Sequence, residues 1–123
     1  MWAWNHDPAS RTIENRRVFA TTHDLPGRPD GACVYADGFY WSANVDVWQV
    51  VRYDPKGQIE RTIPIPVQKS SMPCFGGLDL DTLYVTSIGN GGTSPMAEGQ
   101  PLAGGLFACQ PGIKGRPKPL FAG

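Results

Sequence analysis

Hydrophobic and polar residues alternate over short runs along most of the chain, and the runs end at glycine, proline or aspartate. A period of two is typical of β-strands that bury one face. Asp37-Gly38 and the segment 54–57 (Asp-Pro-Lys-Gly) indicate tight turns, because glycine accepts the positive φ that such turns need. No stretch keeps a helical hydrophobic period over about ten residues. The pattern predicts strands over 1–5, 14–21, 32–35, 39–43, 48–53, 58–65, 76–80, 83–88, 105–109 and 119–122.

The predicted strands form an internal repeat. Residues 39–43 align with residues 83–87 at a spacing of 44, and Gly31 aligns with Gly76 at a spacing of 45. Four short strands in a unit of about 40 to 50 residues are typical of a β-propeller blade. The fold class is therefore predicted to be all-β, a partial β-propeller of about two and a half four-stranded blades.

These blades divide a single domain into a half blade at 1–22, a blade at 29–66 and a blade at 70–123. Two and a half blades cannot close a ring of typically four to eight, so apolar sheet faces stay exposed at both ends. We therefore expect either a missing N-terminal propeller half or association of several copies. In a homo-oligomer, Trp2 and Trp4 are expected near the contact.

Composition supports the all-β interpretation. The chain holds 15 Gly and 12 Pro among 123 residues, too many for a helix bundle, since both residues disfavour helix interiors. A hydrophobic content of 41% also excludes a disordered chain. The 11 Lys and Arg balance the 11 Asp and Glu, so the basic excess of a nucleic-acid-binding protein is absent.

No apolar run approaches the roughly 20 residues of a membrane-spanning helix, and MWAWNHDPAS lacks the features of a signal peptide. The expected location is the cytoplasm. The three cysteines, Cys33, Cys74 and Cys109, are widely spaced without any CxxC pair. We interpret them as small buried hydrophobic residues rather than zinc ligands or disulfide partners.

Asp30 is the strongest candidate for chemistry, since it stands between Pro29 and Gly31 at the start of a predicted inner strand. A carboxylate there would point into the mouth of the propeller channel, where it could ligate a cation or act as a general base. The competing interpretation is a turn residue held by a local hydrogen bond. The repeat places Phe75 at the equivalent position of the next blade.

The other polar candidates point to structure rather than catalysis. His6 and His23 are interpreted as surface residues, and Ser70, Ser71 and Ser94 lack the G-x-S-x-G context of a serine hydrolase. The run 89–92 is glycine-rich but lacks the lysine of a phosphate loop. All four tryptophans are expected to pack between blades; they are Trp2, Trp4, Trp41 and Trp48.

Several motifs, in order along nearly the whole chain, resemble the SMP-30/gluconolactonase/regucalcin family. They are Trp2-Ala3-Trp4, the segment 15–19 (NRRVF), 28–31 (RPDG), 37–41 (DGFYW), 51–57 (VRYDPKG), 74–77 (CFGG), 83–87 (LYVTS) and 103–107 (AGGLF). Each motif is weak alone, whereas the ordered set is specific.

The resemblance implies a six-bladed propeller, more than twice as long as this chain, that hydrolyses sugar lactones or related esters. It also implies one divalent cation (Ca, Zn, Mg or Mn) held by a Glu, an Asn and the Asp of the Pro-Asp-Gly motif. Only that Asp maps here, onto Asp30, as metal ligand and catalytic base; the other two are expected upstream of Met1. Tyr35 departs from the family, which usually has an acidic residue there.

Two functions follow from this resemblance. The first is a C-terminal fragment of a metal-dependent lactonase, which by itself binds the cation weakly and acts on no lactone. The alternative is a self-associating truncated propeller that serves as a binding or assembly module without catalysis.

Overall fold

The computed structural model describes residues 1–35, 37–89 and 98–117, and its regular structure there is entirely β. No helix of this part could cross a membrane. The all-β prediction is confirmed. The strands are β1 (Trp2–Asp7), β2 (Thr12–Val18), β3 (Arg28–Val34), β4 (Tyr40–Val45), β5 (Gln49–Tyr53), β6 (Ile59–Pro64), β7 (Ser70–Gly76), β8 (Thr82–Ser87) and β9 (Leu106–Cys109).

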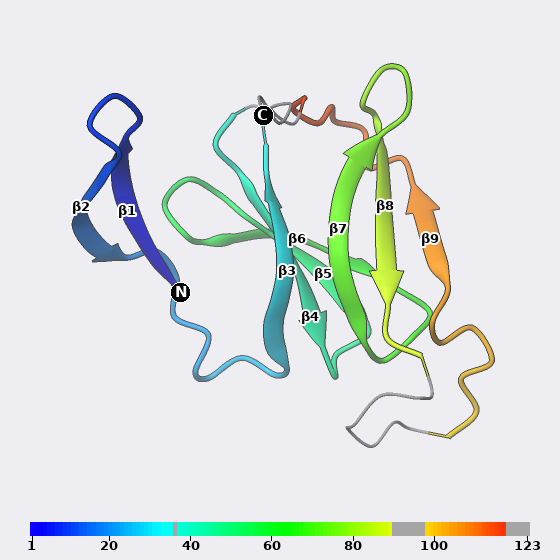
Figure 1. The fold of residues 1–123 in the computed structure, drawn as a ribbon. Coiled ribbons are helices and arrows are strands. Elements are labelled where there is room, and N and C mark those ends of the chain that lie inside the picture. Colours follow the sequence, from blue (N-terminus) through cyan, green and yellow to red (C-terminus); the bar gives the residue numbers. More distant parts are fainter. Residues whose placement is uncertain (36, 90–97, 118–123) are drawn as a thin grey trace.

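The strands form three antiparallel sheets, each made of strands that follow one another in the sequence. Their orders are β1-β2, β3-β4-β5-β6 and β7-β8-β9. In Figure 1 the first strands of the two larger sheets, β3 and β7, lie side by side, and the β1–β2 hairpin stands apart. This is the predicted partial propeller. The strand expected at 119–122 lies outside the described residues.

The main hydrophobic core lies between the two larger sheets. Trp41 of β4 is fully buried there, with its ring centroid 6.0 Å from that of Phe75 on β7. The cluster also holds residues of β5 and β8, Val50, Leu83 and Val85 among them. A smaller cluster on the other face of the four-stranded sheet joins Val51 and Tyr53 to Ala20.

The other three tryptophans correct the sequence prediction. Trp2, Trp4 and Trp48 are 56%, 44% and 41% exposed, so Trp41 alone packs between sheets in the described part. Trp2 and Trp4 lie on a hairpin that has only two strands, and no second sheet covers it. Alternation with small residues therefore identified strand positions, but it did not identify burial.

A charged side chain enters the main core. The Arg52 side chain on β5 is only 7% exposed, and its Nη1 donates to Oε2 of Glu60 at 2.8 Å. Its guanidinium also lies 3.7 Å from the ring centroid of Phe39 and 5.6 Å from that of Tyr35. Aromatic faces and one carboxylate thus compensate the buried cation. Tyr35, at the family's acidic position, packs against Phe75 with ring centroids 5.0 Å apart.

The first strand of the third sheet is displaced from the predicted range 76–80. It runs over Ser70–Gly76, and a turn occupies the residues after it, with Gly77 at a φ of 84°. Pro73 lies inside this strand, fully buried. A proline is accommodated because β7 pairs only with β8, which leaves the other edge without ladder hydrogen bonds.

Candidate functional site

Asp30 lies within β3, beside an irregularity in the ladder that joins β3 to β4. Pro29 pairs with Asn44 and Ala32 pairs with Ser42, so the register shifts between these two pairs. Such bulges bend a strand and change the direction in which a side chain points. The Asp30 side chain is exposed. The sequence thus placed this carboxylate correctly at the start of an inner strand.

Gly31 brings β3 into close contact with β7. A Cβ atom at this position would lie 2.5 Å from the carbonyl oxygen of Ser71 and would also collide with Sδ of Met72. Only glycine allows two strands to approach this closely. The β7 ladder has its own irregularity between Ser70 and Met72, so Ser71 lies beside the Asp30–Gly31 bulge. The alignment of Phe75 with Asp30 is therefore wrong.

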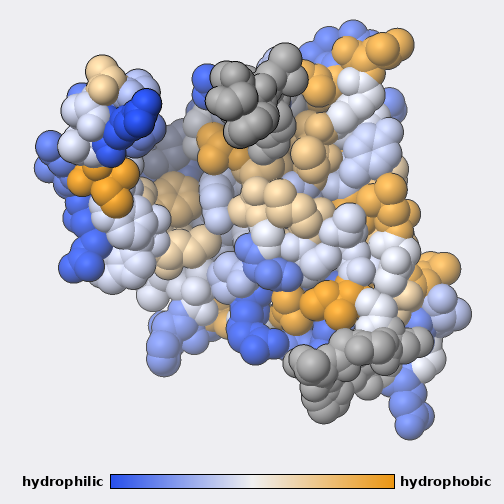
Figure 2. Space-filling view, in the orientation of Figure 1, coloured by the Kyte–Doolittle hydropathy of each residue, from blue (hydrophilic) through white to orange (hydrophobic). Residues whose placement is uncertain are grey.

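A group of charged side chains lies at the same end of the sheets. Nη2 of Arg28 is 3.3 Å from Oδ2 of Asp46, and Nζ of Lys69 is 3.8 Å from Oδ1 of the same carboxylate. The Lys69 side chain is only 2% exposed. Figure 2 shows hydrophilic side chains gathered over the lower end of β3. No sequence motif marked Lys69, because these charges come from separate strand ends.

The described residues do not form a complete metal site. No three His, Cys, Asp or Glu side chains come together among them to hold an ion. Asp30 supplies one carboxylate, whereas Mg²⁺ and Ca²⁺ take six or more oxygen ligands. Its carboxylate suits one position around such a cation, and the other ligands would have to come from elsewhere.

The remaining sequence candidates lie away from Asp30 or outside the described residues. His6 and His23 are exposed, and Nδ1 of His23 is 3.1 Å from Oδ1 of Asp24. Ser94 and residues 90–92 fall outside the described part. Cys33 is buried, and the other two cysteines are partly buried. Burial raises the pKa of the Cys109 thiol.

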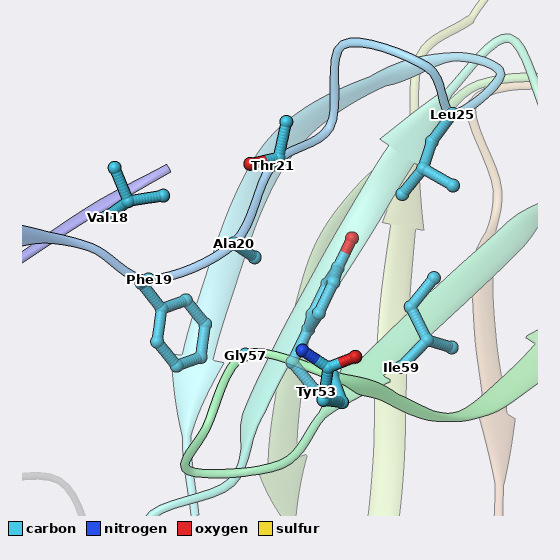
Figure 3. Close-up of a pocket in the computed structure, with 9 residues that line it drawn as sticks. Val18, Phe19, Ala20, Thr21, Leu25, Tyr53, Gly57 and Ile59 are labelled. Carbon is cyan, nitrogen blue, oxygen red and sulfur yellow. The ribbon is translucent and has the colours of Figure 1, made fainter.

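Two hollows lie beside the linker, residues 19–27 between β2 and β3, and beside the β1–β2 hairpin. Asp30 lines neither of them. The first, of about 600 Å³, lies between residues 18–21 and the β5–β6 hairpin. Figure 3 shows the Tyr53 ring rising inside it toward Leu25. Burial raises the pKa of the Tyr53 hydroxyl. The second, the hairpin hollow, measures about 520 Å³ and separates Trp2 and Trp4 from Val34 and Tyr40.

Comparison with known sequences gives consistent matches. The profile of the SMP-30/gluconolactonase/LRE-like region matches residues 1–89. Regucalcin of Gallus gallus is 37% identical over 123 residues, which cover 98% of this chain and 41% of the relative. A 6-deoxy-6-sulfogluconolactonase of Pseudomonas putida is 42% identical over 97 residues, or 79% of this chain and 33% of the relative. The chain thus spans about two fifths or less of these relatives.

Solved structures agree in fold. A luciferin-regenerating enzyme superposes with a TM-score of 0.80 at 27% identity, over 94% of this chain and 39% of that one. A regucalcin of Agrobacterium tumefaciens strain C58, described as a calcium-binding protein, gives a TM-score of 0.74 at 29% identity. That match covers 86% of this chain and 36% of the regucalcin.

Proposed function

The chain belongs to the SMP-30/gluconolactonase/LRE-like family, and from this membership we propose that it is the Asp30-bearing part of a metal-dependent sugar-lactone hydrolase. The observation that carries the proposal is the exposed Asp30 carboxylate at the β3 bulge, beside the close approach to β7. The name of one relative, a 6-deoxy-6-sulfogluconolactonase, supports the substrate class.

In this proposal Asp30 acts on the water that attacks the lactone. Its carboxylate accepts a proton from the water, and the water oxygen forms a bond with the lactone carbonyl carbon. The ring C–O bond then breaks, and the departing oxygen takes the proton to give a hydroxy acid. A divalent cation, when bound, would polarise the carbonyl and lower the pKa of the water.

Asp30 by itself is not sufficient for this chemistry. The described part holds no group of three or more His, Cys, Asp or Glu side chains that could hold an ion, so in this proposal the remaining ligands come from another propeller segment. We therefore expect the purified chain to hydrolyse gluconolactone at the background rate. Calorimetry should detect no sub-micromolar affinity for Ca²⁺ or Zn²⁺.

A chimera tests the proposal directly. In it, this chain replaces the stretch of Gallus gallus regucalcin that it matches. Metal-dependent hydrolysis of gluconolactone by the chimera, lost in Asp30→Asn, would support the proposal. Asp24→Asn is the matched control, because the Asp24 side chain is 92% exposed on the linker. A folded chimera without activity, or one that keeps its activity in Asp30→Asn, would overturn it.

One observation favours the alternative, a binding or assembly module without catalysis. Trp2 and Trp4 expose large apolar surface on a two-stranded hairpin, and such surfaces mark interaction sites. A self-associating module predicts a concentration-dependent oligomer of the chain alone. Light scattering at micromolar concentration separates this alternative from the lactonase fragment, which should remain a monomer.

A further inference from the structure

Arg28 lies two residues before Asp30 on β3 and is the basic residue of that strand. Both side chains are exposed, and the half-buried Pro29 stands between them. Two residues of an extended strand span roughly 6.5 Å. The ladder between β3 and β4 is regular at this end, where Arg28 pairs with Val45. A cation therefore stands one short step along the strand from the candidate catalytic carboxylate.

Asp46 holds the Arg28 side chain in place. Nη2 of Arg28 is 3.3 Å from Oδ2 of Asp46, whose Oδ1 is 3.8 Å from Nζ of Lys69. The backbone of Asp46 is fixed as well, because its N–H donates to the carbonyl oxygen of Gln68 at 3.0 Å and its φ is 74°. Aspartate is one of the few residues other than glycine that adopt this left-handed conformation at small cost. The carboxylate is thus a fixed anchor between two cations.

The stability of the fold does not account for the pair of Arg28 and Asp46. The Arg28 side chain is 69% exposed and that of Asp46 is 37% exposed, and such pairs contribute little stability because water screens the charges. Lys69, which is only 2% exposed, already gives the same carboxylate a buried cation. Arg28 adds a second cation, so these three side chains leave an excess of one positive charge at the surface.

The Arg28 guanidinium is suited to bind a second oxyanion. Arginine has five N–H donors in a planar fork, and the hydrogen bond to Asp46 uses one of its two terminal nitrogens. Such a fork fits the two oxygens of a carboxylate. The groups that position Arg28 come from β3, the end of β4 and the residue before β7, where Val45 forms a bridge with Lys69. Two adjoining sheets of this chain therefore fix the cation beside Asp30.

We infer that Arg28 is a specificity-determining residue, and that the lactone substrate carries a monoanionic group, such as a carboxylate, at the end of the sugar opposite its lactone carbonyl. The inference rests on the proposed function, since it takes Asp30 to act at that carbonyl. The anionic group forms charge-assisted hydrogen bonds with Arg28 and is repelled by Asp30. This polarity turns the uncharged lactone ring toward Asp30. A monoanion also matches the single excess positive charge.

Two sugar lactones that differ only at C6 test the inference. D-Glucaro-1,4-lactone carries a carboxylate there, whereas D-glucono-1,4-lactone carries a hydroxymethyl group. Both are assayed with the chimera in which this chain replaces the matching stretch of Gallus gallus regucalcin. In Arg28→Gln the ratio of kcat/KM for the charged lactone to that for the neutral lactone should fall at least about tenfold, as loss of a charge-assisted hydrogen bond predicts. The fall should come from KM, because the contact is made before the reaction begins.

Arg17→Gln is the matched control, because it removes the same charge from an exposed strand position, where Arg17 donates to Oδ1 of Asn5. Its ratio should equal that of the unmodified chimera. Arg28→Lys should recover part of the preference, since it keeps the charge but not the planar fork. Circular dichroism verifies that each variant is folded. An unchanged ratio in Arg28→Gln, or an equal fall in Arg17→Gln, would overturn the inference.

A binding measurement separates this inference from the proposed function. The chimera is titrated, with nuclear magnetic resonance detection, with D-glucuronate and D-glucose, which differ in the same group and are not hydrolysed. Glucuronate should bind more tightly than glucose, and Arg28→Gln should abolish the difference. An inactive chimera with this binding would refute the proposed function and leave the role of Arg28 standing. An active chimera with neither preference would refute only the role of Arg28, and a chimera with neither activity nor this binding would overturn both.

Discussion

Replacing Trp41 tests whether the buried contact between the two larger sheets stabilises the fold. The Trp41 side chain is fully buried between β4 and β7. A buried tryptophan removes about 200 Å² from water, worth about 5 kcal/mol at 25 cal/mol per Å². Partial collapse of the neighbouring side chains recovers part of this, so Trp41→Ala should cost about 4 kcal/mol. That is a large fraction of the roughly 6 to 18 kcal/mol expected for a chain of this length.

Urea unfolding followed by circular dichroism measures the loss. With a slope near 2 kcal/mol per molar, the midpoint should fall by about 2 M. The control is Trp48→Ala, which removes the same side chain from a position that is 41% exposed. It should cost less than about 1 kcal/mol. Equal midpoint shifts in the two variants, or a shift below 0.5 M for Trp41→Ala (about 1 kcal/mol), would refute the burial argument.

Three further predictions concern charge and reactivity. The hydroxyl of Ser10 donates to the Asp7 carboxylate and holds its pKa below the ordinary value. The β1–β2 turn is therefore stabilised above about pH 4 and loses this contribution as the pH falls. Amide exchange across the turn should rise in acid, but not in Asp7→Asn. Glu60→Ala removes the carboxylate that pairs with the buried Arg52 and should lower the free energy of unfolding in urea by about 2 kcal/mol. The control is Asp79→Ala, because the Asp79 side chain, which pairs with Lys114, is 74% exposed; it should cost less than about 0.5 kcal/mol. Burial raises the pKa of Cys109, so at pH 8 its alkylation should be slower in the folded chain than in urea; equal rates would contradict this.

The sequence predicted those features that depend on local backbone chemistry. Gly38 and Gly57 adopt φ values of 78° and 79° in the two turns where glycine was expected. The long alternating runs became β4, β5 and β8 with limits that differ by at most a few residues. Period-two patterns and turn residues act over a few positions, so one sequence is enough to identify them.

Features that depend on packing between sheets were not predictable in the same way. The sequence pattern indicated a strand over 76–80, whereas β7 runs over Ser70–Gly76 with Pro73 inside it. The pairing of β7 on one side only makes that proline acceptable. Trp4 resembles Trp41 in its local sequence pattern, but no sheet covers it. The pairing of Lys69 with Asp46 joins two strand ends, and no local pattern records such a contact.

The candidate site shows the same division. Asp30 could be placed at the start of an inner strand from its neighbours Pro29 and Gly31 alone. Its counterpart in the next blade could not, because the alignment of the repeat gave Phe75, whereas the strand registers place the corresponding bulge of β7 at Ser71. The number of residues between the bulge and the next strand differs between β3 and β7. A repeat aligned at one constant spacing therefore cannot match the two bulges.

The order of strands within each sheet has a consequence for how the chain folds and evolves. Every ladder among the described strands joins strands that are consecutive in the sequence, so each sheet can form from local contacts with little loop-closure cost. We expect the side-chain layer around Trp41 to join sheets that have already formed. A blade is thus one uninterrupted stretch of the gene, and duplicating, deleting or exchanging it breaks no strand pair inside the neighbouring blades. In such a molecule, an exchanged blade is tolerated only if its faces pack against those of the neighbouring blades.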